Sequence, residues 1–183
     1  MRVIGGVYRS RRLRAVEGLG VRPTSDRLRE TLFNILGASV AGSRFLDLCA
    51  GSGAVGIEAL SRGAQQAVFV EQSRRACDVI EANLQGLDIA SRASIICREV
   101  MAALKQLASA SAPFDLIFFD PPYASALYAT VLSYLGESLV IEENGILVVE
   151  HRAKTPLASD YGRLQQFRQL KQGESALAFY RAV

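Results

Sequence analysis

The chain has 183 residues and a net charge of +3. Half of the residues are hydrophobic, and at this length they are sufficient for one domain with a full core. Its three cysteines lack metal-ligand spacing and are odd in number, and its single histidine leaves no histidine-based cluster, so we expect neither disulfides nor a metal. The sequence has no apolar signal segment and no run long enough to span a membrane, so we expect a cytoplasmic protein without a membrane partner.

The first 30 residues form a basic segment. They contain eight arginines and three acidic residues, whereas the rest of the chain contains 13 basic and 15 acidic residues. Alternating stretches at 2–4 and 13–16 predict a small β-hairpin with arginines at its turn and on its exposed face. Arginine suits phosphates and base edges, so we expect nucleic-acid binding here; a solvated charged surface is the alternative. A boundary near residues 18–24 separates a basic arm, 1–23, from the main domain, 24–183.

A helix and then a strand–turn–helix–strand unit follow the arm. Thr24 or Ser25 can cap the helix, which ends before Gly37. The unit comprises an apolar strand at 45–49, a glycine turn, a helix at 54–62 and an apolar strand at 67–71. Such a βαβ unit predicts an α/β fold, Rossmann-like and doubly wound, with a mostly parallel sheet.

Glycines and two acids in this unit indicate a nucleoside cofactor. Gly51 and Gly53 allow a sharp turn and a close approach to backbone N–H groups, and Glu71 can accept both hydroxyls of a ribose. Together with Gly56 they also fit a dinucleotide-binding pattern. Asp47, four residues before Gly51, is expected at the mouth of the strand, where it would repel a pyrophosphate but attract the ammonium of an amino acid. We therefore favour S-adenosylmethionine over a nicotinamide cofactor.

The remaining elements alternate along the chain. A helix capped by Ser73 runs to about Leu87, and Glu99 and Val100 follow the third strand, where they could bind an adenine. The apolar surroundings of Cys49 and Cys97 predict buried thiols. The expected elements after the capped helix are strand 93–97, helix 100–107, strand 114–119, helix 126–135, and strands 145–150, 164–170 and 176–182, which complete a seven-stranded sheet.

The stretch Asp120-Pro121-Pro122-Tyr123 directly follows the most hydrophobic strand. The two prolines predict a rigid extended turn with free carbonyl oxygens, Asp120 adds a carboxylate, and Tyr123 adds an aromatic face. This set suits a planar base that carries an exocyclic amine, whose protons would go to Asp120 and the Pro121 carbonyl. A proline-stiffened turn without a ligand is the alternative.

Several motifs resemble one bacterial enzyme family over nearly the whole chain. They are Arg2-Val3-Ile4-Gly5-Gly6, Arg22-Pro23-Thr24 with residues 26–30 and 33–34, Asp47 with Ala50-Gly51-Ser52-Gly53, residues 58–63, and Asp120 to Tyr123. Together they resemble the 16S ribosomal RNA guanine-N2 methyltransferases of the RsmD type.

The resemblance implies S-adenosylmethionine as donor, no metal, and a guanine N2 of 16S rRNA as acceptor. It implies that the partner is the small ribosomal subunit or its assembly intermediate. The implied cofactor-binding residues are Asp47, Ala50, Gly51, Gly53, Glu71, Glu99 and Val100. The implied catalytic residues are Asp120, Pro121, Pro122 and Tyr123, and the implied RNA contacts are Arg2, Arg9, Arg11, Arg12, Arg22, Thr24, Arg27 and Arg29.

Other acceptors and other functions stay open at this point. The same chemistry could act on a DNA base or on a protein glutamine amide. A non-catalytic RNA-binding module, with a purely architectural glycine turn, is a further alternative. Because no long exposed apolar stripe is evident, we expect a monomer.

Overall fold

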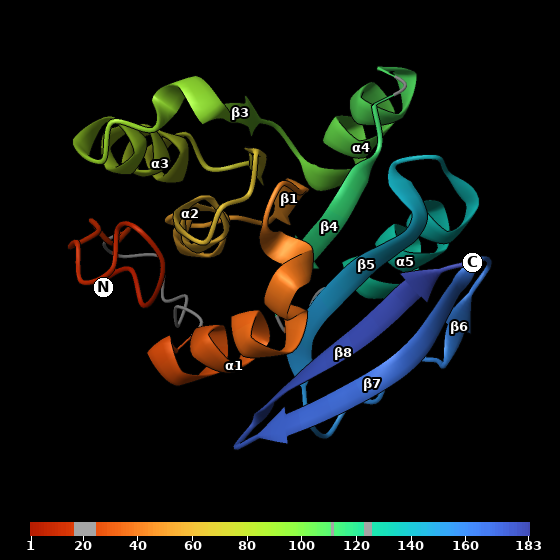
Figure 1. Ribbon diagram of the computed structural model, residues 1–183. Coiled ribbons are helices and arrows are strands. Elements are labelled where there is room, and N and C mark those ends of the chain that lie inside the picture. Colours follow the sequence, from red (N-terminus) through yellow and green to blue (C-terminus); the bar gives the residue numbers. More distant parts are fainter. Residues whose placement is uncertain (17–24, 111, 123–125) are drawn as a thin grey trace.

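One eight-stranded sheet forms the centre of the molecule (Figure 1). The structure, a computed structural model, describes residues 1–16, 25–110, 112–122 and 126–183. The strand order is β3-β2-β1-β4-β5-β8-β7-β6. The strands are β1 (Arg44–Leu48), β2 (Gln66–Glu71), β3 (Ala93–Cys97), β4 (Phe114–Phe119), β5 (Ile141–Arg152), β6 (Asp160–Tyr161), β7 (Leu164–Gln172) and β8 (Ser175–Ala182).

The described residues also form five α-helices and two short 3-10 helices. They are α1 (Asp26–Leu36), η1 (Gly37–Val40), α2 (Ala54–Ser61), α3 (Arg74–Gly86), η2 (Ala90–Arg92), α4 (Val100–Ser109) and α5 (Leu127–Glu137), of which α1 and η1 precede β1. Two of the predicted caps are confirmed: the side chain of Ser25 accepts from the N–H of Leu28, and that of Ser73 accepts from the N–H of Ala76.

Strands β1 to β5 are parallel, and β8, β7 and β6 extend the sheet in antiparallel fashion. The predicted sheet had seven strands, and the structure adds β6, which pairs Tyr161 with Leu164 and Asp160 with Gln165. Two residues are too few to show the alternation by which a strand is recognised in a sequence. The predicted class, a mostly parallel doubly wound sheet, is confirmed.

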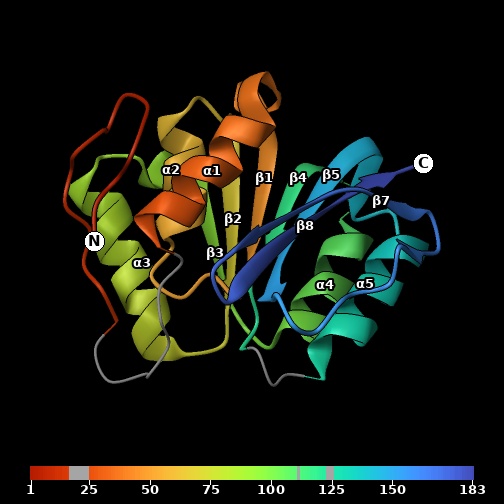
Figure 2. The same cartoon turned by 90° about the horizontal axis from the view of Figure 1, so that it is seen from below.

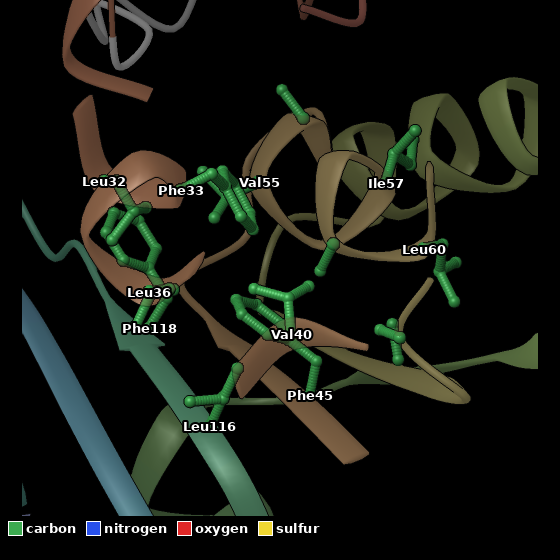
Figure 3. Packing of buried hydrophobic residues seen from close by; sticks show 14 of the residues in the cluster. Leu32, Phe33, Leu36, Val40, Phe45, Val55, Ile57, Leu60, Leu116 and Phe118 are labelled. Carbon is green, nitrogen blue, oxygen red and sulfur yellow. The ribbon is translucent and has the colours of Figure 1, made fainter. Parts of the chain in front are cut away.

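Helices cover both faces of the sheet (Figure 2). Helices α1, α2 and α3 pack on one face, where Phe45, Phe69 and Phe118 point, and α4 and α5 pack on the other. Figure 3 shows the first of these cores, in which Phe33 of α1 stacks on Phe45 of β1 with ring centroids 6.2 Å apart. Successive residues of β1 and β4 alternate between the cores, as buried parallel strands do.

The basic arm folds back as a hairpin against α2 and α3. The hairpin has a single antiparallel bridge, between Arg2 and Arg12, instead of two strands. The N–H of Val3 donates to the Arg11 carbonyl at 3.0 Å, and the N–H of Leu13 donates to the Met1 carbonyl at 3.0 Å. Val3 and Leu13 are both buried, so the arm contributes to the main core. The predicted boundary between residues 23 and 24 lies outside the described residues.

The cysteines and the single histidine also bear on the sequence predictions. Cys77 is the buried cysteine, whereas Cys49 and Cys97, which we expected to be buried, are partly exposed: Cys49 follows the last residue of β1, and Cys97 is the last residue of β3. His151 is buried in β5, and its Nδ1 lies near two backbone carbonyls, which indicates a structural role.

Among the described residues, no helix is both long and apolar enough to cross a membrane.

Candidate active site

The turn that follows β1 has an unusual backbone. Cys49, Gly51 and Gly53 all have positive φ, at 61°, 57° and 76°. The N–H of Ala50 donates to the Val70 carbonyl at 3.0 Å, and the N–H of Gly53 donates to the Ala50 carbonyl at 2.8 Å. A Cβ placed on Gly51 would meet nothing within 4 Å, so open space adjoins this backbone. A ligand can therefore approach the turn where its N–H groups lead into α2.

The carboxylate of Glu71 closes this turn from the neighbouring strand. Its Oε2 accepts from the N–H of Gly51 at 2.9 Å, and its Oε1 accepts from the N–H of Ser73 at 2.8 Å. Glu71 is the last residue of β2 and is partly exposed. It thus lies beside the open space at Gly51, at the position predicted for a ribose-binding acid.

Asp47 is buried beneath the turn and not at the mouth of the strand, where we expected it. Its side chain is 1% exposed, and its Oδ2 accepts from the N–H of Gly56 in the first turn of α2 at 2.8 Å. Burial raises the pKa of Asp47 to about 7, with a further contribution from Glu71, while the Gly56 hydrogen bond opposes the rise. Asp47 therefore changes charge near neutral pH.

Glu99 caps the helix that follows β3. Its two carboxylate oxygens accept from the N–H groups of Met101 and Ala102, both at 3.1 Å. Val100 is the first residue of α4 and is buried. The cap fixes the start of α4 at the same edge of the sheet as the glycine turn.

Asp120 follows β4, the strand next to β1. Its N–H donates to the Leu48 carbonyl at 3.4 Å, which holds the start of the proline stretch against the end of β1. Pro121 is buried, and its carbonyl accepts from the hydroxyl of Tyr128 at 3.4 Å; Pro122 is exposed. Tyr123, the predicted stacking residue, lies outside the described residues.

The four predicted acids lie at the carboxyl ends of four adjacent parallel strands, and their charges act on the thiol of Cys49. Its pKa rises to about 12, first because of burial and then because of the charges of Glu71, Asp120, Asp47 and Glu99, in that order. These charges come from the carboxyl ends of β3, β2, β1 and β4, which are adjacent in this order in the sheet. The structure thus brings the predicted acids together at the carboxyl ends of the parallel strands, where open α/β sheets bind their ligands.

Most of the arginines predicted to bind RNA are exposed. Arg2, Arg9, Arg11, Arg12 and Arg27 all have exposed side chains. Arg22 and Thr24 lie outside the described residues.

Arg29 is the exception, and we correct its assignment. Its side chain is 0% exposed, its Nη2 donates to the Arg2 carbonyl at 2.6 Å, and its Nε lies 3.7 Å from Oε2 of Glu58. Burial lowers its pKa, and the carboxylates of Glu58 and Asp26 oppose that effect. The side chain joins α1 to the arm and cannot contact RNA.

Glu58 was not identified as important from the sequence. It is fully buried in α2, and its carboxylate accepts from the N–H groups of Ile4 and Gly5, each at 2.7 Å, and from Nε of Arg62 at 2.7 Å. The spacing of Glu58 and Arg62, four residues apart on a helix, was the available signal. No local pattern indicates that the arm would supply the other donors.

Among the described residues, no group of three or more His, Cys, Asp or Glu could hold a metal ion.

Known proteins resemble the chain over almost its whole length. A family model described as conserved hypothetical protein 95 matches residues 1–181. The ribosomal RNA small subunit methyltransferase D of Haemophilus influenzae is 35% identical over 182 residues, which cover 99% of this chain and 92% of that protein. A solved structure of a Thermus thermophilus hypothetical protein is 30% identical, with a TM-score of 0.84 and 98% of each chain covered.

A more distant neighbour shares the fold alone. The structure of an RNA methyltransferase from Salinibacter ruber in complex with S-adenosyl-L-homocysteine has a TM-score of 0.68 at 13% identity, covering 88% of this chain and 94% of that one. The sheet, with helices on both faces, is the Rossmann-like fold of these methyltransferases.

Proposed function

We propose a function from one premise: the chain belongs to the protein family described as conserved hypothetical protein 95. The chain transfers a methyl group from S-adenosylmethionine to the exocyclic N2 of a guanine in the 16S rRNA of the small ribosomal subunit. The name of the Haemophilus relative supports the RNA substrate. The observation that carries the chemistry is the position of Asp47, Glu71, Glu99 and Asp120 at the carboxyl ends of four adjacent parallel strands, around the open glycine turn.

The residues at the turn fit S-adenosylmethionine. The open space at Gly51 admits a ligand to the backbone, and Glu71, beside it, would hold the ribose hydroxyls. Asp47 places negative charge beneath the turn, which would attract the ammonium of the cofactor, and Glu99 with Val100 would border the adenine. When bound, S-adenosylmethionine supplies an electrophilic methyl group on a sulfonium.

Asp120 and Pro121 would orient the acceptor. The N2 amine of guanine is a poor nucleophile because its lone pair is delocalised into the ring. Asp120 would accept one amine proton in a hydrogen bond and the Pro121 carbonyl the other, which favours a lone pair localised on nitrogen. Tyr123 would stack on the base. The rigid proline turn sets the position of the base before the reaction, and this positioning supplies much of the rate.

The arm would hold the RNA at the mouth of this site. Arg2, Arg9, Arg11 and Arg12 are exposed on the arm, and Arg27 is exposed on α1. Phosphate contacts of this kind position an RNA without reading its sequence. The identity of the guanine would then depend on the shape of the subunit around it.

Methyl transfer from labelled S-adenosylmethionine to small ribosomal subunits tests the proposal. The subunits come from cells that lack the protein, so that the target guanine is unmodified. The wild-type chain should label 16S rRNA, and digestion should release N2-methylguanosine. Asp120→Asn should reduce the rate about a hundredfold or more, because an amide accepts the amine proton less well. Asp88→Asn is the matched control, since Asp88 is exposed at a φ of 58°, which asparagine tolerates.

Three results would contradict the proposal. They are full activity in Asp120→Asn, a different modified nucleoside, and label that appears only in DNA or protein. The last would favour a DNA base or a glutamine amide as acceptor.

A further inference from the structure

The side-chain amide of Asn83 joins two segments that are far apart in the chain. Asn83 lies on α3 and is 4% exposed. Its Oδ1 accepts from the N–H of Arg14 at 2.7 Å, and its Nδ2 donates to the carbonyl of Arg14 at 3.1 Å. The same Nδ2 donates to the carbonyl of Ser52 at 3.1 Å. Arg14 belongs to the basic arm, and Ser52 is the middle residue of the glycine turn.

These three hydrogen bonds fix the orientation of the Asn83 amide. One amide oxygen and two amide protons are all directed at backbone groups, and both backbone polar groups of Arg14 are satisfied by one side chain. The amide is buried, so losing one of these partners leaves a polar group without compensation. The side chain of Arg14 itself is exposed and remains available to RNA.

A second contact ties the arm to the same turn. The hydroxyl of Ser52 donates to Sδ of Met1 at 3.6 Å, and the carbonyl of Met1 accepts from the N–H of Leu13 at 3.0 Å. Both sides of the hairpin therefore reach Ser52, one through Met1 and the other through Arg14 and Asn83. A displacement of the arm along α3 would break a contact to the turn.

We propose that Asn83 is a positioning residue that couples RNA binding at the arm to cofactor binding at the glycine turn. This inference rests on the proposed function, because it takes the arm as the RNA site and the turn as the cofactor site. A cofactor that orders the Gly51–Gly53 turn orders the Ser52 carbonyl, and through Asn83 it orders the backbone of Arg14. RNA on the arm acts in the opposite direction by the same bonds. Such coupling is reciprocal, so each ligand must tighten the other by the same factor.

The coupling factor is measurable with S-adenosylhomocysteine as the probe. Affinity for small ribosomal subunits from cells lacking the protein is measured with and without saturating S-adenosylhomocysteine. For the wild-type chain we expect it to tighten subunit binding by about fivefold or more, the lower end of typical allosteric coupling. In Asn83→Asp the acceptor is kept, but both donated bonds are lost, and in Asn83→Ser the side chain is too short. Both variants should bring the factor to about one.

A matched control and a second readout separate coupling from folding. Gln85→Ala removes an exposed amide from the same helix, one that donates to Oε1 of Glu81 at 3.4 Å, and should keep the wild-type factor. Hydrogen exchange needs no RNA: S-adenosylhomocysteine should slow exchange across residues 1–16 in the wild-type chain and not in the Asn83 variants. If Asn83 had a purely structural role, its replacement would lower thermal stability. It would leave unchanged both the coupling factor and the slowing of hydrogen exchange by S-adenosylhomocysteine.

The possible failures are distinguishable. If wild-type protein methylates subunits but its coupling factor is near one, the inference is overturned while the proposed function stands. If the Asn83 variants retain the wild-type factor, the inference is also overturned. If the wild-type chain methylates no RNA, the proposed function fails, and the exchange experiment with S-adenosylhomocysteine alone still decides whether the turn and the arm are linked. Unchanged exchange at residues 1–16 in the wild-type chain would refute that link.

Discussion

The carboxylate of Glu71 accepts a hydrogen bond from the backbone N–H of Gly51 at 2.9 Å, across two neighbouring parallel strands. The acid that ends β2 thereby holds the turn that ends β1. Its second oxygen is occupied by the N–H of Ser73. One side chain thus fixes both loops that border the open space at Gly51, before any ligand is present.

Replacing Glu71 with glutamine should weaken both cofactor binding and the fold. Two N–H donors point at the carboxylate, and the amide nitrogen of a glutamine would oppose one of them. We expect a loss of stability of about 1–2 kcal/mol and a loss of S-adenosylhomocysteine affinity of about tenfold or more. Calorimetric titration and thermal unfolding give both values. Glu81→Gln, an exposed change on α3, should alter neither; equal cofactor affinity in both variants would contradict the role of Glu71.

Asp47 should give the protein a pH dependence near neutrality. Its pKa is raised to about 7 in the folded state from an ordinary value of 3.8, so the folded state favours the protonated acid. The stability that this group contributes is therefore complete below about pH 4 and is lost as the pH rises to 7, by on the order of 4 kcal/mol. Attraction for the cofactor ammonium has the opposite trend, because it requires the ionised form. Affinity for S-adenosylhomocysteine should rise between pH 5.5 and 7.5.

The Asp47→Asn variant tests both trends at once. An asparagine can still accept from the N–H of Gly56 but cannot ionise. Its unfolding free energy should lose the downward slope between pH 4 and 7, and its cofactor affinity should be low and independent of pH. A variant that keeps the wild-type profile would assign the titration to another group. Asp88→Asn serves again as the exposed control.

Gly56 should tolerate no larger residue. A Cβ at this position would lie 2.3 Å from Cε1 and 2.8 Å from Cζ of Phe69, a fully buried side chain of β2. Gly56→Ala should therefore destabilise the protein by about 1–3 kcal/mol, as overpacking usually does. The Phe69→Leu change should make the alanine less costly than it is in the wild-type background. Denaturant unfolding of the two single variants and the double variant measures this coupling, and strict additivity would show that the clash is relieved elsewhere.

The arm arginines should determine the salt dependence of RNA binding. Changing Arg9 and Arg12 to glutamine removes two exposed charges from the hairpin. We expect weaker binding to small ribosomal subunits, and a log–log slope of affinity against salt that is shallower by about 1.4, since each of the two phosphate contacts contributes about 0.7 for single strands. Arg168→Gln, an exposed change on β7, should leave the slope as it is. An unchanged slope in the double variant would place the RNA on another surface.

The sequence predicted the parts of the fold that depend on neighbouring residues. The strand, turn and helix around Gly51 and Gly53 have local signals in glycine spacing and apolar periodicity, and the structure places them with small changes at their ends. The capping serines, Ser25 and Ser73, were likewise identified by their position before an apolar period.

The predictions failed where the determining partner is far away in the chain. Arg29 has the appearance of a surface cation, but it is buried because Glu58, 29 residues later, lies opposite it. Asn83 has no sequence signal at all, since its partners lie 69 and 31 residues before it. The burial of Asp47 likewise depends on how α2 packs over β1. Such contacts arise from the packing of elements and not from their internal periodicity.

Strand β8 lies inside the sheet, and this has a consequence for synthesis. β5 and β7 both pair with β8, at residues 175–182. Until residues 175–182 are available, β5 has one bare edge, and β7 can pair only with the two-residue strand β6. Unpaired edges of this kind attract other chains. A nascent chain paused at that point would be a substrate for chaperones, and the emergence of eight further residues would close the gap between the two strands.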